Sequence, residues 1–152
     1  MQRLTKHYDR ITNILSGRFF ESGALLLSRL ALAGVFWRSG RTKVVDGSWL
    51  EISGTTRYLF QEEYSALPLP AELSMHLATY AEHLFPILLV VGLATRVSAV
   101  SLLLMTMTIQ IFVYPEAWWP AHSLWVALSL ILMTRGAGIL SVDALLGKWR
   151  GA

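Results

Sequence analysis

Charged and imidazole side chains lie within or beside stretches of this sequence that are hydrophobic enough to cross a membrane. These groups belong to Arg29, Arg38, Glu82 and His83. An Arg or Asp at the middle of a membrane helix costs roughly 2.5–3.5 kcal/mol, against about 0.3–0.6 kcal/mol gained per Leu, Ile, Phe or Val. The apolar neighbours therefore still favour insertion, and each buried charge is a candidate functional group.

More polar side chains are expected at one depth, near the outer ends of the hydrophobic stretches. At 3.6 residues per turn, His76, Tyr80 and His83 fall on one face of a helix. Together with neighbouring segments they predict an outward-facing polar pocket, whose lining includes Arg38, Arg41, Tyr80, His83, Gln110 and Tyr114. The competing interpretation makes Tyr114 part of an aromatic belt at the membrane surface and Gln110 an interhelical hydrogen-bonding group.

Three histidines raise the possibility of a metal site. The imidazoles of His76, His83 and His122 are ligands that zinc and copper accept. His76 and His83 are two turns apart, roughly 10 Å in rise, so one ion needs the helix to bend. Pro86 supplies a reason for a bend. The alternative is that these histidines are ordinary hydrogen-bonding partners.

Glu82 is expected near the middle of the membrane, where an unpaired carboxylate would take up a proton. Arg29 is closer to this depth than Arg38, and the two arginines lie on opposite faces of their helix. The sequence therefore predicts that Arg29 and Glu82 form a structural charge pair. Arg38 is then left to face the pocket with His83. Snorkelling of Arg29 to the inner surface is the other interpretation.

Four membrane helices are predicted to position these groups. The chain is 54% hydrophobic and only 15% charged, with a mean hydropathy of +0.48, whereas a soluble domain carries about 25% charge. We expect one all-α domain over residues 1–152, an integral membrane four-helix up-down bundle with short connections. The membrane helices are predicted at about 23–41, 71–93, 97–114 and 118–134.

The outer loop, residues 42–70, is predicted to form a lid over the mouth of the bundle. A short helix is expected to be capped by Thr55 or Thr56 and to run to Tyr64, ahead of two prolines. The side chains expected to hold it against the bundle are Trp49, Tyr58 and Leu59.

The two ends of the predicted bundle differ in charge. Eight Lys and Arg residues lie on the side of the termini and three on the side of the 42–70 loop. The positive-inside rule then predicts a multi-pass protein of the bacterial inner membrane with both termini cytoplasmic. Residues 1–20 read as an amphipathic interfacial helix, and Ser141–Trp149 as a second one capped by Ser141. Nucleic acid is not expected as a partner, because no aromatic-basic module accompanies the charge.

Several short motifs, in their order and spacing, resemble the DoxX family of small bacterial inner-membrane proteins. They are the segment Ser28–Gly34, the Gly-x-x-Lys of Gly40–Lys43, the acidic Glu82 and the turn Gly92–Arg96. The resemblance covers about residues 22–135. It implies a four-helix bundle and, from thiosulfate:quinone oxidoreductase relatives, quinone-linked redox chemistry. Segments beginning at Ser39, Leu59, Ala81 and Ile109 resemble more narrowly a subgroup encoded near bufferin-type metal-buffering peptides.

Two functions follow from these observations. In the first, which the family resemblance favours, the chain is a redox-associated subunit whose pocket holds a quinone head group. Arg38 or Gln110 would donate hydrogen bonds to it, and His83 with Glu82 would be the catalytic proton source. In the second, it is a non-enzymatic membrane factor in copper handling or complex assembly, with the three histidines as ligands.

The chain contains no cysteine. Disulfides, thiolate metal sites and cysteine-ligated iron–sulfur clusters within this chain are therefore excluded. A redox role would need a borrowed cofactor or a partner subunit to carry the electrons. Beyond the lipid bilayer, we therefore expect a partner subunit or a second copy of the chain.

Overall fold

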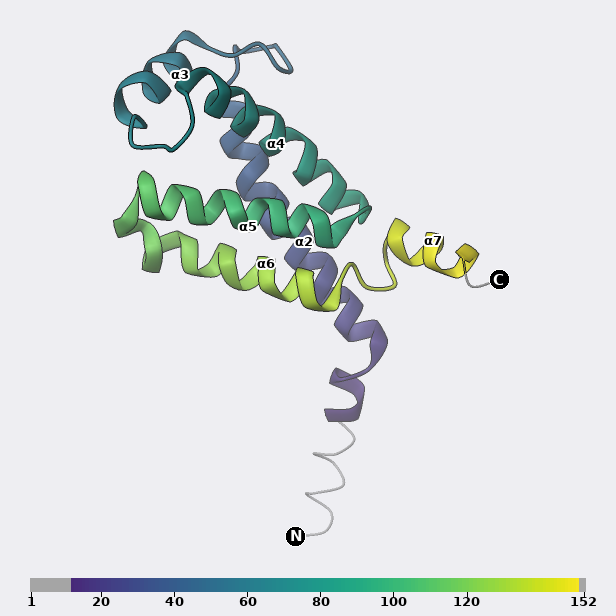
Figure 1. Ribbon diagram of the computed structural model, residues 1–152. Helices are drawn as coiled ribbons and strands as arrows, with labels where there is room; N and C mark the ends of the chain where they lie inside the picture. Colours follow the sequence, from purple (N-terminus) through teal and green to yellow (C-terminus); the bar gives the residue numbers. More distant parts are fainter. Residues whose placement is uncertain (1–11, 151–152) are drawn as a thin grey trace.

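The computed structural model describes residues 12–150, all of whose long elements are helices (Figure 1). The long helices are α2 (Arg18–Thr42), α4 (Ala71–Val91), α5 (Thr95–Phe112) and α6 (Ser123–Arg135). Shorter helices are α3 (Gly54–Tyr58), η1 (Leu59–Glu63), η2 (Pro115–Ala117), η3 (Trp118–His122) and α7 (Val142–Arg150). The predicted all-α fold is confirmed.

Three of the helices, α2, α4 and α5, are long and apolar enough to cross a membrane. The fourth predicted span is divided, because the π-helical turn η3 leads directly into the 13-residue α6. The first span begins at Arg18 rather than at about residue 23, so the end of the predicted interfacial segment 1–20 already belongs to α2. Residues 1–11 of that segment lie outside the described part of the chain.

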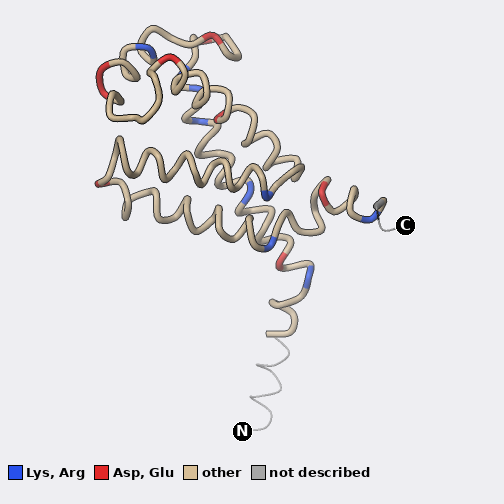
Figure 2. The backbone as a smooth tube through the Cα atoms, in the orientation of Figure 1, with Lys and Arg blue, Asp and Glu red and all other residues tan. Residues whose placement is uncertain are grey.

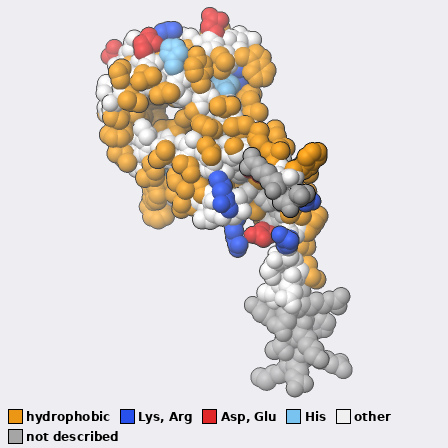
Figure 3. All heavy atoms as spheres, turned by 45° about the vertical axis from the view of Figure 1, so that its right-hand side comes forward, with side chains coloured by type: hydrophobic (Ala, Val, Ile, Leu, Met, Phe, Trp, Pro, Cys, Tyr) orange, Lys and Arg blue, Asp and Glu red, His pale blue; other side chains and the backbone are white. Residues whose placement is uncertain are grey.

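The four long helices form a closed antiparallel bundle. Helix α2 packs against α4 and α6, and α5 packs against the other sides of α4 and α6. Side chains buried between them form the core, namely Leu25, Leu32, Ala33, Phe36, Leu89, Ala99, Leu102 and Leu132. Apolar side chains also cover much of the outer face in Figure 3, and Leu27 and Leu104 are 68% and 64% exposed. Such an apolar exterior suits a lipid environment.

The bundle has two structurally different ends. At one, here called the loop end, lie α3, η1 and the turns between α5 and α6 (Figure 1). At the other, the terminal end, a turn at Gly92–Ala94 joins α4 to α5, and α7 follows α6. The carboxylate of Asp143 in α7 accepts hydrogen bonds from the backbone N–H groups of Ala94 (2.8 Å) and Thr95 (2.9 Å). The turn is thereby fixed at its apex.

The predicted cap of the C-terminal helix is confirmed. Ser141 precedes α7, and its hydroxyl oxygen accepts a hydrogen bond from the backbone N–H of Ala144 (3.2 Å). This satisfies one of the N–H groups that have no partner within a helix's first turn.

Inside the terminal end, the side chain of Arg29 links α2 to the end of α4 and to the segment between α6 and α7. Its side chain is fully buried and donates hydrogen bonds from Nη1 to the carbonyl of Leu89 (3.1 Å) and from Nη2 to that of Leu140 (2.6 Å). The last carbonyls of a helix lack intrahelical partners and carry partial negative charge, so a guanidinium is well matched to the end of α4.

The predicted ion pair between Arg29 and Glu82 is wrong. Helix α4 lies against α2 in a register that brings Glu82 beside Gly40, where an added Cβ would lie 3.0 Å from the Glu82 Cβ. Arg29 instead lies level with Gly92, which follows Glu82 by ten residues, or about three helical turns. Glu82 is therefore level with the loop-end half of α2 and takes a different partner.

Replacing Gly92 should destabilise the terminal end. Gly92 has φ +73°, and a Cβ there would come within 2.2 Å of Arg29 Nη1. We expect Gly92→Ala to cost at least about 1–3 kcal/mol through backbone strain alone, and more through displacement of Arg29. Thermal unfolding of the detergent-purified protein measures the loss. Gly34→Ala is the matched control, because nothing lies within 4 Å of its added Cβ. Equal melting temperatures for the two variants would contradict this.

Candidate ligand-binding site

A cavity of about 420 Å³ opens at the loop end, between α2, α4, α5 and the loop segment that follows α3. We call it the loop-end cavity. Its walls are mostly apolar, and those side chains include Val35, Phe36, Phe60, Leu77, Ala78, Ala81, Met105, Ile109, Val113 and Trp125. A few polar side chains also line it, namely Ser39, Lys43, Tyr64, Ser74, Glu82, Thr108, Tyr114 and His122. A largely apolar cavity with a few placed polar groups is the usual form of a small-molecule site.

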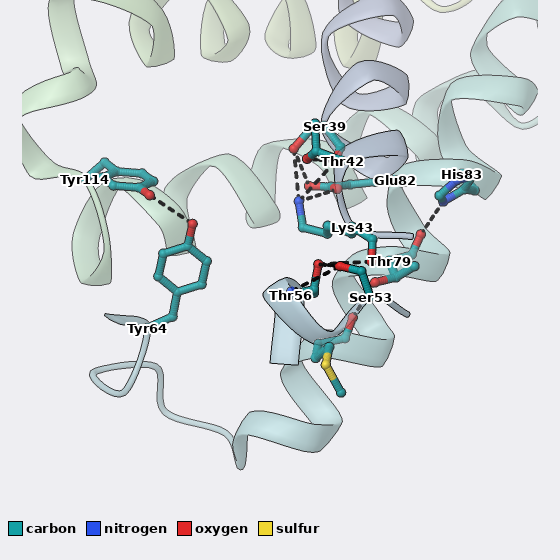
Figure 4. Close-up of polar contacts among 11 residues, drawn as sticks. Ser39, Thr42, Lys43, Ser53, Thr56, Tyr64, Thr79, Glu82, His83 and Tyr114 are labelled. Carbon is teal, nitrogen blue, oxygen red and sulfur yellow. Dashed lines mark hydrogen bonds and ion pairs between the residues drawn. The ribbon is translucent and has the colours of Figure 1, made fainter. Parts of the chain in front are cut away.

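A buried ion pair forms one wall of this cavity. Lys43 Nζ lies 2.6 Å from Glu82 Oε2, and the two side chains are 16% and 1% exposed. Ser39 completes the cluster, because its hydroxyl accepts a hydrogen bond from Lys43 (3.0 Å) and donates one to Glu82 Oε1 (3.2 Å) (Figure 4). A carboxylate at this depth is costly unless it is paired, so Lys43 compensates the burial of Glu82.

Lys43 also connects the cavity to the loop above it. It is the C-cap residue that directly follows α2, and its carbonyl accepts hydrogen bonds from the backbone N–H of Ser53 and the hydroxyl of Thr56, both at 3.0 Å. Ser53 caps α3, since its hydroxyl accepts a hydrogen bond from the N–H of Thr56 (3.2 Å). The predicted cap at Thr55 or Thr56 is therefore wrong, and it lies two or three residues too late in the chain.

The loop covers the cavity, as its predicted role as a lid requires, but with other side chains than expected. Phe60 and Tyr64 line the cavity, and the hydroxyl groups of Tyr64 and Tyr114 are hydrogen-bonded at 2.9 Å (Figure 4). Of the side chains predicted for this contact, Tyr58 is 62% exposed, whereas Trp49, although 68% exposed, packs its ring on Trp37 of α2 with the centroids 6.1 Å apart. In the lid it is Phe60, and not Tyr58, that faces the cavity.

His122 enters the cavity wall from η3 and is oriented by Gln110. Its Nδ1 lies 2.7 Å from Gln110 Oε1, while Gln110 Nε2 donates to the carbonyl of Pro115 (2.7 Å). Because the amide nitrogen is engaged with Pro115, the amide oxygen faces His122 and Nδ1 is the donor, which leaves Nε2 as the acceptor in the neutral ring. Gln110 thus positions an imidazole rather than lining the cavity itself.

The other residues predicted for the pocket lie elsewhere. Arg38 and Tyr80 are exposed on the outside of the bundle, and Arg41 donates a hydrogen bond to the carbonyl of Ser48 (2.8 Å) in the loop. His83 is buried, but its Nδ1 lies 2.7 Å from the carbonyl of Thr79 and its ring packs on Trp37. Of the predicted pocket and proton-handling residues, the cavity collects Glu82 and Tyr114.

The three predicted metal ligands are not brought together. Each has its own local partners: His76 lies beside Glu72, His83 beside Thr79, and His122 beside Gln110. Within residues 12–150, no group of three His, Cys, Asp or Glu side chains is placed to hold a metal ion. Pro86 is buried inside an uninterrupted α4 and does not bend His76 towards His83.

Comparison with known proteins bears on what this arrangement represents. The DoxX family profile matches residues 24–115, more than half of the chain. The chain belongs to the DoxX family. It is 35% identical to a Haemophilus influenzae Rd protein named only as an uncharacterized protein, over 82% of this chain and 84% of that one. No solved structure matches. As a DoxX protein with long apolar helices, it is a multi-pass membrane protein. The narrower subgroup stays a prediction.

The motif residues that resemble DoxX proteins fall into two clusters. Gly40 and Lys43 meet Glu82 at the loop end, where Gly40 permits the close approach of α2 and α4. Arg29 meets Gly92 at the terminal end. The sequence contained the signal for the correct pairing, because Lys43 is itself a motif residue. The predicted 42–70 loop, however, places Lys43 outside the membrane helices and away from a buried carboxylate.

Removing Lys43 should destabilise this DoxX protein more than removing both partners. Lys43→Met leaves the Glu82 carboxylate unpaired at 1% exposure, and breaking a buried pair costs about 3–5 kcal/mol. The double variant Lys43→Met/Glu82→Met should recover most of this loss, since two apolar side chains replace the pair. Unfolding free energies from denaturant titration in mild detergent measure the cycle. A double variant no more stable than Lys43→Met would refute the pairing. Arg38→Gln, at an exposed site, should stay within about 0.5 kcal/mol of the wild type.

The lid contact at Tyr64 should depend on pH. Burial, together with the hydrogen bond to Tyr114 and nearby negative charge, raises the pKa of Tyr64 above its ordinary value of 10.0. The folded state therefore holds the phenolic proton more tightly than the unfolded state. The stabilisation is complete below about pH 10 and is lost as the pH rises further. The tyrosinate absorbance of the wild type minus that of Tyr64→Phe isolates this group. Its titration at the same pH in folded and denatured protein would contradict the assignment.

Proposed function

We propose that this DoxX protein is a membrane redox subunit that binds the head group of a quinone in the loop-end cavity. The observation that carries the proposal is the ion pair of Lys43 and Glu82 on the wall of an otherwise apolar cavity. A quinone needs this combination, because its ring and tail favour apolar surroundings while its carbonyl oxygens accept hydrogen bonds. The cavity volume of about 420 Å³ lies within the range of small-molecule sites.

The side chains of the ion pair have distinct roles in this proposal. The ammonium group of Lys43 has three donors, and its partners are the Glu82 carboxylate (2.6 Å), the Ser39 hydroxyl (3.0 Å) and, at the long distance of 3.5 Å, the Ser39 carbonyl. The donor of this last, long contact can turn to a quinone carbonyl instead. When a carbonyl oxygen gains negative charge on reduction, the ammonium group gives that oxygen a proton and becomes a neutral amine. Glu82, no longer paired with a cation, then takes up a replacement proton from the medium and returns it to the amine. These roles replace those predicted for Arg38 and His83.

The opposite side of the cavity offers a second set of hydrogen-bonding groups. Tyr64 and Tyr114 share one hydrogen bond, so one phenolic hydrogen remains available. His122, fixed by Gln110, presents Nε2 as an acceptor, which suits a hydroxyl of the reduced ligand rather than a quinone carbonyl. A quinone has two carbonyl groups, and donors on opposite walls suit such a ligand.

Electrons must come from outside this chain, because it has no cysteine to hold a thiol or cluster centre. We propose that a partner subunit delivers them, and that the chain contributes the quinone site within the bilayer. The charge distribution supports an orientation with the loop end outside the cytoplasm of a bacterial inner membrane. In Figure 2, Asp and Glu concentrate at the loop end, while Arg and Lys mark the terminal end.

Quinone content of the purified protein tests the proposal. Wild-type protein extracted in mild detergent should carry quinone that organic solvent releases and that absorbance quantifies. The Lys43→Met/Glu82→Met variant should carry at least tenfold less, because the hydrogen-bond donor is gone while the fold is kept. Arg38→Gln is the control, because it removes a cation that lies outside the cavity, and it should retain the wild-type content. The proposal fails if the wild type carries no quinone or if all three proteins carry the same amount.

A further inference from the structure

Helices α4 and α5 lie close together at the terminal end and spread apart towards the loop end (Figure 1). Their connecting turn at Gly92–Ala94 is held by the Asp143 carboxylate through two backbone N–H groups. From this turn the two helices spread apart towards the loop end, where the loop segment lies between their far ends (Figure 1). The loop-end cavity lies in this space, since residues of both helices line it.

The opening of the cavity is apolar. Four of its lining residues are exposed, namely Pro68, Leu69, Leu77 and Tyr114. They lie at the first turns of α4, at the segment that precedes it and just beyond the end of α5, and none of them carries a charge. An opening onto water is usually bordered by polar side chains, whereas this border matches the apolar outer faces of α4 and α5, on which Leu73 and Ile111 are 47% and 61% exposed.

The polar groups lie away from that opening. Glu82 is 1% exposed and Lys43 16%, and the loop above them is held down by the bonds from Ser53 and Thr56 to the Lys43 carbonyl. Phe60 of the loop is itself buried at 5% exposure. The cavity thus has a polar inner end and an apolar mouth, and the direct path from the loop side to the ion pair is covered.

We infer that the cavity is loaded sideways from the bilayer, through the seam between α4 and α5, and that its ligand carries an apolar tail that lies in this seam. The inference rests on the proposed function and adds to it the route by which the ligand enters and the apolar tail of that ligand. The head group reaches the ion pair while the tail stays between Leu77 and Ala78 of α4 and Thr108 of α5. A tail in this position buries apolar surface that a head group alone leaves exposed.

Two quinones that differ only in the tail test this inference. Binding of decylubiquinone and of tail-less ubiquinone-0 is measured by competition with the purified protein in lipid nanodiscs. Ala78→Trp should weaken decylubiquinone binding at least tenfold and leave ubiquinone-0 within twofold, because the indole fills the seam and not the polar end. Ala127→Trp, at an exposed position of α6 outside the cavity lining, should change neither. Leu77→Trp at the exposed rim carries the same test if Ala78→Trp does not fold.

The possible outcomes distinguish a failure of the inferred entry route from a failure of the proposed quinone binding. Wild-type protein that binds both quinones with equal affinity overturns the inference about the tail and leaves the proposed function standing. Equal losses for both quinones in Ala78→Trp also overturn it, because the head group would then occupy the seam. Wild-type protein that binds neither quinone overturns the proposed function itself. A loss confined to decylubiquinone supports the route.

Discussion

The arrangement of the loop end depends on one buried ion pair. Glu82 is almost completely removed from solvent, so a cation must reach it, and Lys43 does so from the position that directly follows α2. This requirement fixes which turns of α2 and α4 lie opposite each other, and Gly40 allows the helices to approach at that level. Because the same Lys43 residue holds the start of α3 through its carbonyl, the pair also sets the position of the loop over the cavity.

The polar groups at the two ends of the bundle differ in how fully they are hydrogen-bonded to the protein itself. At the terminal end, the two Nη atoms of Arg29 and the carboxylate of Asp143 are engaged by backbone carbonyl and N–H groups, and Nε of Arg29 is the one guanidinium nitrogen without a partner. At the loop end, the ion pair, two tyrosines and a histidine face an open volume. A network whose groups are mostly hydrogen-bonded to backbone makes a rigid apex, whereas polar groups that border a cavity can meet a ligand. Function is therefore expected at the loop end.

The elements could be predicted from the sequence, and their relative placement could not. Hydrophobic length and composition located the long helices, and serine capping located α7. The predicted pairing failed because it depended on helix register: the cation that lies beside Glu82 is Lys43, 14 residues further along the chain than Arg29. The predicted metal site of three histidines failed for a related reason. Shared depth along an axis does not bring side chains together when each one finds a nearer carbonyl or amide partner.

The central claim is that the ammonium group of Lys43 meets a quinone carbonyl at the polar end of the cavity. Infrared difference spectroscopy with ubiquinone labelled by ¹³C at its carbonyl groups tests this directly. In the wild type, one carbonyl band should shift to lower frequency on binding, because a charged donor weakens the C=O bond. The shift should be absent in Lys43→Met/Glu82→Met and present in Arg38→Gln. A shift that survives in the double variant, or no shift in the wild type, would contradict the account.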